Sequence, residues 1–295
     1  MTELKNNLKN VIFDEPMKKH TTFRIGGNAD AFIIPESIEE VLLSIDLCEK
    51  NNIPYYILGN GSNVLVGDKG FRGAVIKIFK NLSKVEVSGS SIKAEGGALL
   101  SAVSKKALEN GLQGLEFASG IPGTLGGGVC MNAGAYGGEM KDVIYKVTVL
   151  KDGRVFEISN NQAEFSYRNS RMLKEKMVVL GAEMVLKKGN KDEISAKMME
   201  FNRLRSEKQP LDFPSAGSTF KRPEGYFAGK LIMDSGLRGY TVGGAAVSEK
   251  HCGFVINKGG ATAKDVLTLI DNVKKIVYDK FNVMLEPEIR IIGEF

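Results

Sequence analysis

The pattern of apolar and polar residues at the start of the chain predicts strands that flank a helix. Short apolar runs typical of buried strands occur at Ala31–Pro35 and Tyr55–Leu58. Between them, apolar residues recur at helical spacing after Ser37, which stands three residues before Glu40, the spacing of a capping box. We therefore expect strand, helix and strand in this order.

Strand patterns dominate the middle of the chain. The dipeptide Asp152-Gly153 separates two alternating runs and predicts a hairpin turn. One helix is expected before it and ends at Asn110 and Gly111, which are typical of a helix C-terminus. The predicted strands are Ala74–Phe79, Lys84–Ser88, Ser91–Glu95, Val143–Leu150, Arg154–Ile158 and Met177–Leu186, and the helix is Ala98–Glu109.

The last third of the chain begins with a helix, Asp192–Lys208, that ends at a proline. The stretch Leu211–Gly244 has no strong periodicity. It is followed by a strand at Cys252–Asn257, a helix from Thr262 to about Phe281, and a closing strand at Val283–Ile292. The whole pattern predicts an α+β fold with a boundary near residues 200–210.

Composition narrows the class of protein. The 295 residues suggest about two domains, and the net charge of 40 − 35 = +5 is spread along the chain, so no nucleic-acid partner is required. Two histidines and three cysteines without a C-x-x-C pair argue against a metal site or a disulfide scaffold. No apolar run could span a membrane, and the N-terminus lacks a secretory signal. We therefore expect a cytoplasmic protein.

Glycine is the unusual residue. Of 34 glycines, 18 fall between Gly59 and Gly138, whereas prolines number only eight. Glycine within a region of strands indicates tight turns, or a backbone that approaches another group closely. The glycines therefore mark the candidate binding site.

The first glycine cluster begins like a dinucleotide-binding motif but does not continue as one. Gly59-Asn-Gly-Ser-Asn-Val64 has valine at the third glycine position, and the strand-like Leu65-Val-Gly67 follows it instead of a helix. A Rossmann motif needs a helix at this point. A P-loop is also excluded, because the chain has no G-x-x-x-x-G-K-[ST] sequence.

The second cluster, Gly120–Gly138, is denser. Successive glycines can alternate between right-handed and left-handed conformations, which turns their N–H groups inward as an anion-binding nest. Ser62, Asn63 and Thr124 would add side-chain donors. The alternative is that the glycines only permit tight turns and packing. Two clusters with polar neighbours favour phosphate binding.

At these motifs the sequence resembles the UDP-N-acetylenolpyruvoylglucosamine reductases. The resemblance spans nearly the whole chain. Its motifs are His20-Thr-Thr-Phe-Arg-Ile-Gly-Gly27, Leu58-Gly-Asn-Gly-Ser-Asn-Val-Leu65, Ser119-Gly-Ile-Pro-Gly-Thr-Leu-Gly-Gly127, Asn132-Ala-Gly-Ala-Tyr-Gly137, Tyr167-Arg-Asn-Ser170, Gly217-Ser-Thr-Phe-Lys221 and Leu285-Glu-Pro-Glu-Ile-Arg290.

The resemblance implies an FAD-binding fold of the vanillyl-alcohol-oxidase type, with two α+β subdomains over residues 1–200 that divide near 70–80. The strand 283–295 would complete it, and 201–282 would form a smaller α+β substrate-binding domain. The cofactors implied are FAD and NADPH, and the small-molecule substrate is UDP-N-acetylglucosamine enolpyruvate. The implied FAD contacts are Gly59, Asn60, Gly61, Ser62, Asn63, Gly120, Ile121, Pro122, Gly123, Thr124, Gly126, Gly127, Asn132, Ala133 and Gly134.

The same resemblance implies three catalytic residues. Arg168 would bind the substrate carboxylate as a permanently charged fork. Ser218 would donate a proton to C2 of the enolpyruvyl group, because even a weak acid can protonate so strong a base. Glu288 would hold its proton beside the substrate carboxylate and donate a hydrogen bond. If residues 283–292 form one strand, Arg290 shares a face with Glu288.

The residues that hold the UDP part are less well defined. The chain resembles the shorter subclass of the family, which lacks a tyrosine loop in the third domain. The candidates are Tyr167, Lys221 and Lys230, for which surface positions are the alternative. Taken without their motifs, Arg168, Ser218 and Glu288 would also be interpreted as ordinary surface residues.

Two other functions stay open on the sequence alone. An FAD oxidase of the same fold would be reduced by an alcohol and would take up oxygen. A non-catalytic nucleotide-binding protein would purify without flavin colour. Neither a membrane association nor an obligate protein partner is indicated by the sequence.

Overall fold

The computed structural model describes all residues, 1–295, and the chain divides into two compact units. Unit 1 comprises Met1–Ile12, Phe32–Asn60 and Ala74–Arg205, and unit 2 comprises Phe13–Ala31, Gly61–Gly73 and Ser206–Phe295. The chain therefore passes between the units inside the first glycine cluster, after Asn60, and again inside the long helix α6 (Lys191–Lys208).

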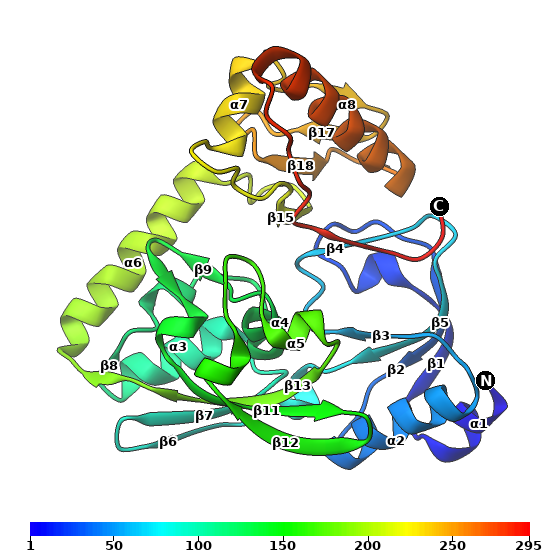
Figure 1. Ribbon diagram of the computed structural model, residues 1–295, viewed down its shortest axis with the longest axis vertical. Coiled ribbons are helices and arrows are strands. Elements are labelled where there is room, and N and C mark those ends of the chain that lie inside the picture. The colour runs from blue at the N-terminus through cyan, green and yellow to red at the C-terminus, as the bar shows by residue number, and fades with distance from the viewer. The chain divides into compact units, whose positions relative to one another are not determined.

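Unit 1 contains an antiparallel five-stranded sheet in the order β12-β11-β13-β7-β6. The predicted hairpin is present, and Lys151 pairs with Arg154 across the Asp152-Gly153 turn. Helix α3 (Leu100–Glu109) lies along this sheet and shares its apolar core (Figure 1). The strands are β6 (Val85–Ser88), β7 (Ser91–Glu95), β11 (Ile144–Lys151), β12 (Arg154–Ser159) and β13 (Val178–Val185).

A four-stranded sheet in the order β1-β2-β5-β3 contains the first strands of the chain. Its strands β3 and β5 pair in parallel, Tyr55 opposite Ala74. Helix α2 begins after Ser37, whose hydroxyl accepts the N–H of Glu40. This is half of the predicted capping box, because the Glu40 carboxylate accepts the N–H of Glu36 instead of that of Ser37. The elements are α1 (Thr2–Asn7), β1 (Val11–Pro16), β2 (Asn28–Ile33), α2 (Ile38–Lys50), β3 (Tyr55–Leu58) and β5 (Phe71–Lys77).

Unit 2 contains a four-stranded antiparallel sheet in the order β15-β18-β17-β16, with α7 and α8 packed together on it (Figure 1). The apolar face of α8 supplies much of the core, through residues such as Leu269 and Val273. A complete capping box of Thr262 and Asp265 begins this helix. The elements are β15 (Ser215–Ser218), α7 (Ala228–Asp234), β16 (Thr241–Val242), β17 (Ala245–Val247), β18 (Phe254–Asn257) and α8 (Ala263–Phe281).

The closing strand is shorter than predicted. Only β19 (Arg290–Ile292) is a strand, and it pairs in parallel with β4 (Val64–Val66), which follows the first glycine cluster. The preceding residues lie beside Thr219–Lys221 instead, with a single bridge between Phe220 and Pro287. The prediction of one strand over 283–292, and of Glu288 and Arg290 on one face of it, was therefore wrong: the chain changes partner between these two residues.

The sequence also missed several elements. It predicted neither α1 nor β1. It also predicted no helix in the glycine-rich segment, where α4 (Leu125–Cys130) forms, and no elements between residues 211 and 244. No helix combines the length and apolar character needed to cross a membrane. The remaining short elements are β8 (Leu112–Gln113), β9 (Gly134–Ala135), β10 (Gly138–Glu139), α5 (Arg171–Lys174) and β14 (Lys187–Lys188).

Candidate active site

The loop from Gly59 to Asn63, here called the 59–63 loop, exposes a run of main-chain donors. The N–H groups of Gly59 and Asn60 donate no hydrogen bond within unit 1, and those of Gly61–Asn63 donate none within unit 2. Its carbonyls are used: Gly61 accepts the N–H of Thr22 at 3.1 Å, and Asn63 accepts that of Arg290 at 2.9 Å. A loop with its carbonyls bonded and its N–H groups open is suited to an anion.

The residue at position 61 must be glycine for two reasons. Its φ is +68°, and a Cβ there would lie 2.1 Å from the carbonyl oxygen of His20. Thr22, two residues after His20, also supports the loop. It donates its N–H to the carbonyl of Gly61 and its hydroxyl to the carbonyl of Ser215 at 2.7 Å. The motif around His20 therefore shapes the 59–63 loop, a role that the sequence did not reveal.

The first part of the second glycine cluster, Gly120–Gly128, does not form the predicted nest of alternating conformations. No glycine between Gly120 and Gly128 has a positive φ. Thr124 instead caps α4, and its hydroxyl accepts the N–H of Gly127. The N–H groups from Leu125 to Gly128 are all bonded within unit 1, as are those of Ile121 and Ala133, two predicted FAD contacts. Two of these glycines serve close packing: a Cβ on Gly126 would lie 3.1 Å from the carbonyl oxygen of Gly96, and one on Gly128 would lie 2.9 Å from Cδ1 of Leu100.

The two clusters nevertheless meet within unit 1. A Cβ on Gly59 would lie 2.4 Å from Oγ1 of Thr124, so the two backbones approach closely only because Gly59 has no side chain. Asn60 donates from Nδ2 to the carbonyl of Pro122 at 2.7 Å. The open N–H groups of the 59–63 loop and this contact are what a bound dinucleotide pyrophosphate needs, and they fit FAD.

Arg168 lies in a tight turn of unit 1. Ser166 and Asn169 exchange two backbone hydrogen bonds around it, and Arg168 itself has a φ of +53°. A left-handed conformation in a residue with a long side chain stores strain, which is typical of functional sites. Its guanidinium lies 5.0 Å from the ring centre of Tyr167 and donates to the carbonyl of Gly134 at 3.4 Å.

Two buried polar residues hold this turn against the second glycine cluster. Asn132, fully buried, donates to Glu139 and to the carbonyl of Ser166 and accepts the N–H of Lys141. All its side-chain bonds are thus internal to unit 1. Ser170 donates to the carbonyl of Cys130 at 2.8 Å. The Asn132 and Tyr167-Arg168 motifs therefore form one structure.

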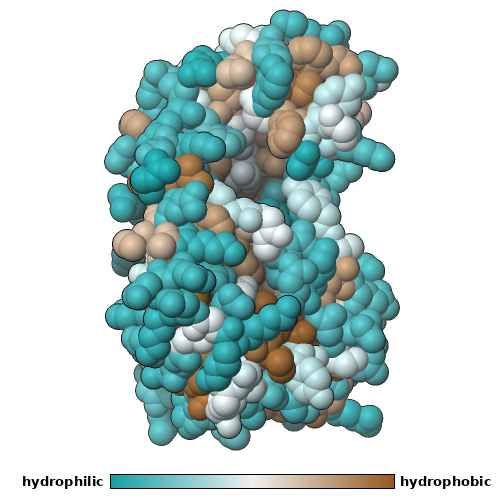
Figure 2. All heavy atoms as spheres, turned by 90° about the vertical axis from the view of Figure 1, so that its left-hand side faces the viewer, coloured by the Kyte–Doolittle hydropathy of each residue, from teal (hydrophilic) through white to brown (hydrophobic).

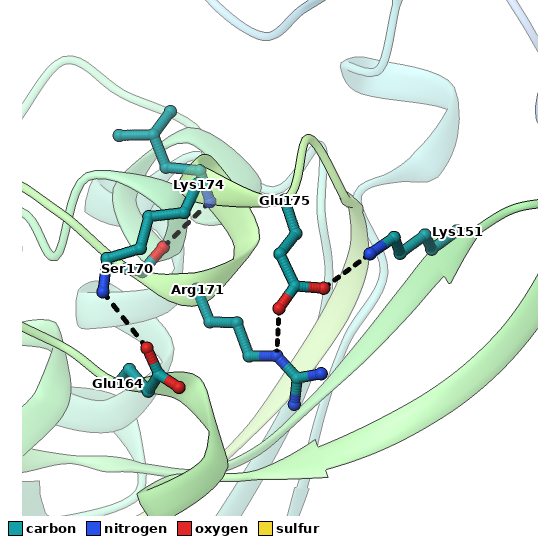
Figure 3. A network of polar contacts seen from close by, with 7 residues as sticks. Lys151, Glu164, Ser170, Arg171, Lys174 and Glu175 are labelled. Atoms are coloured by element: carbon teal, nitrogen blue, oxygen red, sulfur yellow. Dashed lines mark hydrogen bonds and ion pairs between the residues drawn. The ribbon is translucent and has the colours of Figure 1, made fainter.

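Helix α5, which follows the turn, is anchored by ion pairs. Ser170 caps it by accepting the N–H of Leu173, as Figure 3 shows. Glu175 forms ion pairs with Arg171 at 2.7 Å and with Lys151 on β11 at 2.5 Å. Lys174 forms an ion pair with Glu164 at 3.1 Å. Arg171 and Lys174 are thus committed to carboxylates, and the turn that carries Arg168 is fixed at its C-terminal end.

In unit 2 the structure brings Ser218 and Glu288 together with the second part of the 59–63 loop, Gly61–Asn63. Gly217, with a φ of +77°, interrupts the pairing of β15 just before Ser218, and its Cβ position lies 4.0 Å from the carbonyl oxygen of Ser62. Glu288 donates its N–H to the carbonyl of Thr219 at 2.7 Å, and its own carbonyl accepts from Asn63 Nδ2 at 3.3 Å. Backbone bonds on both sides of Glu288 therefore fix its position beside Ser218.

The predicted substrate-binding lysines are both in exposed ion pairs of unit 2. Lys221 contacts Glu286 at 2.9 Å, and Lys230 contacts Asp234 at 2.8 Å, one turn along α7. Exposed pairs of this kind contribute little to stability, so either lysine could exchange its partner for an anion. Tyr167, in unit 1, is exposed at 46%. A substrate role for these three residues stays a prediction.

Comparison with known proteins decides the family. Residues 29–159 match the model of an FAD-binding domain, and residues 209–292 match that of the UDP-N-acetylenolpyruvoylglucosamine reductase C-terminal domain. The reductase of Lachnoclostridium phytofermentans is 53% identical over 100% of this chain and 97% of its own length, and that of Clostridium novyi is 55% identical over 99% and 93%.

This chain belongs to the UDP-N-acetylenolpyruvoylglucosamine reductase family. The reductase structure from Thermus caldophilus superimposes with a TM-score of 0.82 at 35% identity, over 96% of this chain and 98% of that one. The predicted fold class, a vanillyl-alcohol-oxidase-type FAD-binding fold with a smaller α+β domain, is confirmed. The chain is a flavin-dependent oxidoreductase that acts on a small molecule, and its cofactors are FAD and NADPH.

Proposed function

We propose that Arg168, Ser218 and Glu288 carry out the family reaction, the reduction of UDP-N-acetylglucosamine enolpyruvate to UDP-N-acetylmuramate for peptidoglycan. The observation that supports this most is the hydrogen bonding of Glu288, which joins the end of β15 and the 59–63 loop. A cofactor loop and two candidate reacting side chains are thereby held by one stretch of backbone.

The residues that would hold FAD are those of the 59–63 loop, through its open N–H groups, and those around Thr124. When bound, FAD supplies the hydride for C3 of the enolpyruvyl group, with electrons that originate from NADPH. The chain's own residues must then orient the substrate and control the charge that develops on it.

Arg168 binds the enolpyruvyl carboxylate with its guanidinium fork. As hydride arrives at C3, negative charge builds at C2 and spreads into this carboxylate, so the cation stabilises the transition state more than the ground state. Glu288, in its protonated form, donates a hydrogen bond to the same carboxylate. Ser218 transfers its hydroxyl proton to C2, which completes the reduction of the double bond, and solvent restores the serine.

Substitution of Ser218 by alanine tests this assignment. Loss of a positioned proton donor should lower turnover by about 10²–10⁴-fold. Anaerobic bleaching of the flavin by NADPH should persist, because that half-reaction does not use the serine. Ser215→Ala, the same change at the other end of β15, is the control and should turn over normally. Normal turnover in Ser218→Ala would show that the proton comes from elsewhere.

We place the reaction in the cytoplasm. All three cysteines are free thiols, two of them buried, which fits a reducing compartment.

A further inference from the structure

Arg205, on α6, is a cation that unit 1 does not neutralise. Most of this helix faces solvent: Ile194 is its only buried residue, and the side of the molecule where it lies in Figure 1 is mainly hydrophilic in Figure 2. Arg205 is half-buried, and its side chain makes no hydrogen bond or ion pair within its unit. An arginine stays charged under all ordinary conditions, so partial burial without a carboxylate is costly.

Both ends of the second glycine cluster lie against α6, and one of them contacts this arginine. At one end, a Cβ on Gly120 would lie 3.1 Å from Cδ of Arg205 and 2.8 Å from Oδ1 of Asn202, so the glycine makes room for these two side chains. At the other end, the ring of Tyr136 stacks on Phe201 of the same helix, with centroids 4.5 Å apart and planes at 10°. The side chain of Arg205 therefore lies at the site of the predicted cofactor motifs.

Tyr136 is held there against its own backbone preference. Its φ is +52°, a strained conformation for a tyrosine. Burial raises the pKa of its hydroxyl, which therefore remains a neutral donor, and burial also lowers the pKa of the Arg205 guanidinium. The second influence on the pKa of each group, after burial, is the charge of the other. The pair offers donors and positive charge without an anion.

We propose that Arg205, with the hydroxyl of Tyr136, binds a phosphate group of a nucleotide used in the reaction. A guanidinium fork and a hydroxyl match phosphate oxygens in number and geometry. The inference rests on the proposed function, because the proposed reaction uses three phosphate-containing ligands: FAD, NADPH and the UDP-linked substrate. Arg205 is a binding residue and takes no part in proton or hydride transfer.

The test compares Arg205→Met and Tyr136→Phe with Lys208→Met, which removes an exposed charge from the same helix. Three constants are measured without turnover: the Kd of FAD on the apoprotein, the NADPH dependence of anaerobic flavin bleaching, and the Kd of the UDP substrate from the spectrum of the oxidised flavin. None depends on Ser218, so failure here is distinct from failure of the proton-donor assignment.

In Arg205→Met, one of the three constants should rise by about 10- to 100-fold, because charge-assisted hydrogen bonds to the phosphate are lost. The constant that rises identifies the nucleotide whose phosphate Arg205 binds. Tyr136→Phe should raise the same constant less, and Lys208→Met should change none. If Arg205→Met does not fold, Arg205→Lys keeps the charge without the fork and should raise that constant several-fold. Constants within twofold of the parent in every folded Arg205 variant would overturn the proposal.

Discussion

The two glycine clusters look alike in sequence but are built differently. In the 59–63 loop the N–H groups are open, and Gly61 is needed for its positive φ. From Leu125 to Gly128 the N–H groups are bonded within unit 1, and Gly126 allows neighbouring backbone to approach. Glycine content therefore marks both clusters, but only the partners of the N–H groups separate a loop that can bind a ligand from one that packs.

The largest effect is expected from Gly61→Ala, which should abolish flavin binding. A left-handed alanine costs about 1–2 kcal/mol, and here its Cβ would also lie 2.1 Å from the backbone oxygen of His20, which cannot rotate away. The loop must shift, and its donors lose their alignment. Flavin absorbance per chain after purification measures the loss.

Gly89→Ala is the matched control for strain without collision. Its φ is +61°, close to that of Gly61, but no atom lies within 4 Å of a Cβ there. It should lose about 1–2 kcal/mol of unfolding free energy and keep its flavin. If Gly61→Ala also kept its flavin, the 59–63 loop would not be the phosphate cradle.

Gly126→Ala should instead weaken stability and leave flavin affinity unchanged. Alanine gains about 1 kcal/mol in helix propensity, but its Cβ would crowd two backbone oxygens, of Gly96 at 3.1 Å and Val179 at 3.2 Å. Overpacking costs about 1–3 kcal/mol, so the net change is a loss of about 1 kcal/mol. Thermal unfolding and a flavin titration measure the two quantities.

Gly127→Ala, the next residue, reverses the balance. Its nearest neighbour would be Oγ1 of Thr124 at 3.6 Å, an ordinary contact, so helix propensity should prevail and stability should rise by up to about 1 kcal/mol. A Gly126→Ala variant that lost flavin at unchanged stability would contradict the packing role given to α4.

The sequence predicted the elements whose signals are local. The Asp152-Gly153 hairpin and the helix begun by Thr262 and Asp265 lie where turn and capping residues place them. Helix α4 was missed because its sequence, Leu-Gly-Gly-Gly-Val-Cys, has poor helix propensity, and bonds from Leu125 and Gly126 to the segment at 96–98 stabilise it. Long-range hydrogen bonds of this kind leave no periodic pattern.

The candidate site was only partly predictable for the same reason. Motif resemblance assigned catalytic roles to Arg168, Ser218 and Glu288 by position, and these roles stay a prediction. The left-handed φ of Arg168 and the change of partner between Glu288 and Arg290 depend on tertiary contacts. Arg205 lies outside the motifs that carry the resemblance, and only its burial without a counter-charge singles it out.

The smallest effect is expected at a third set of N–H groups, which donate to a carboxylate of the protein itself. Asp265 accepts the N–H groups of Thr262 and Gly244, and these bonds, that of Thr262 most, lower the pKa of its carboxyl. A lowered pKa in the folded state gives stability that is present above the unfolded value of about 3.9 and is lost as the pH falls through the folded value.

Asp265→Asn should therefore cost about 0.3–1 kcal/mol at pH 7, and the difference should shrink below about pH 4. Urea unfolding across this range measures it, with exposed Asp271→Asn as the control for charge alone. A difference independent of pH would mean that shape, rather than the anion, matters at these N–H groups, and would weaken the contrast with the open 59–63 loop.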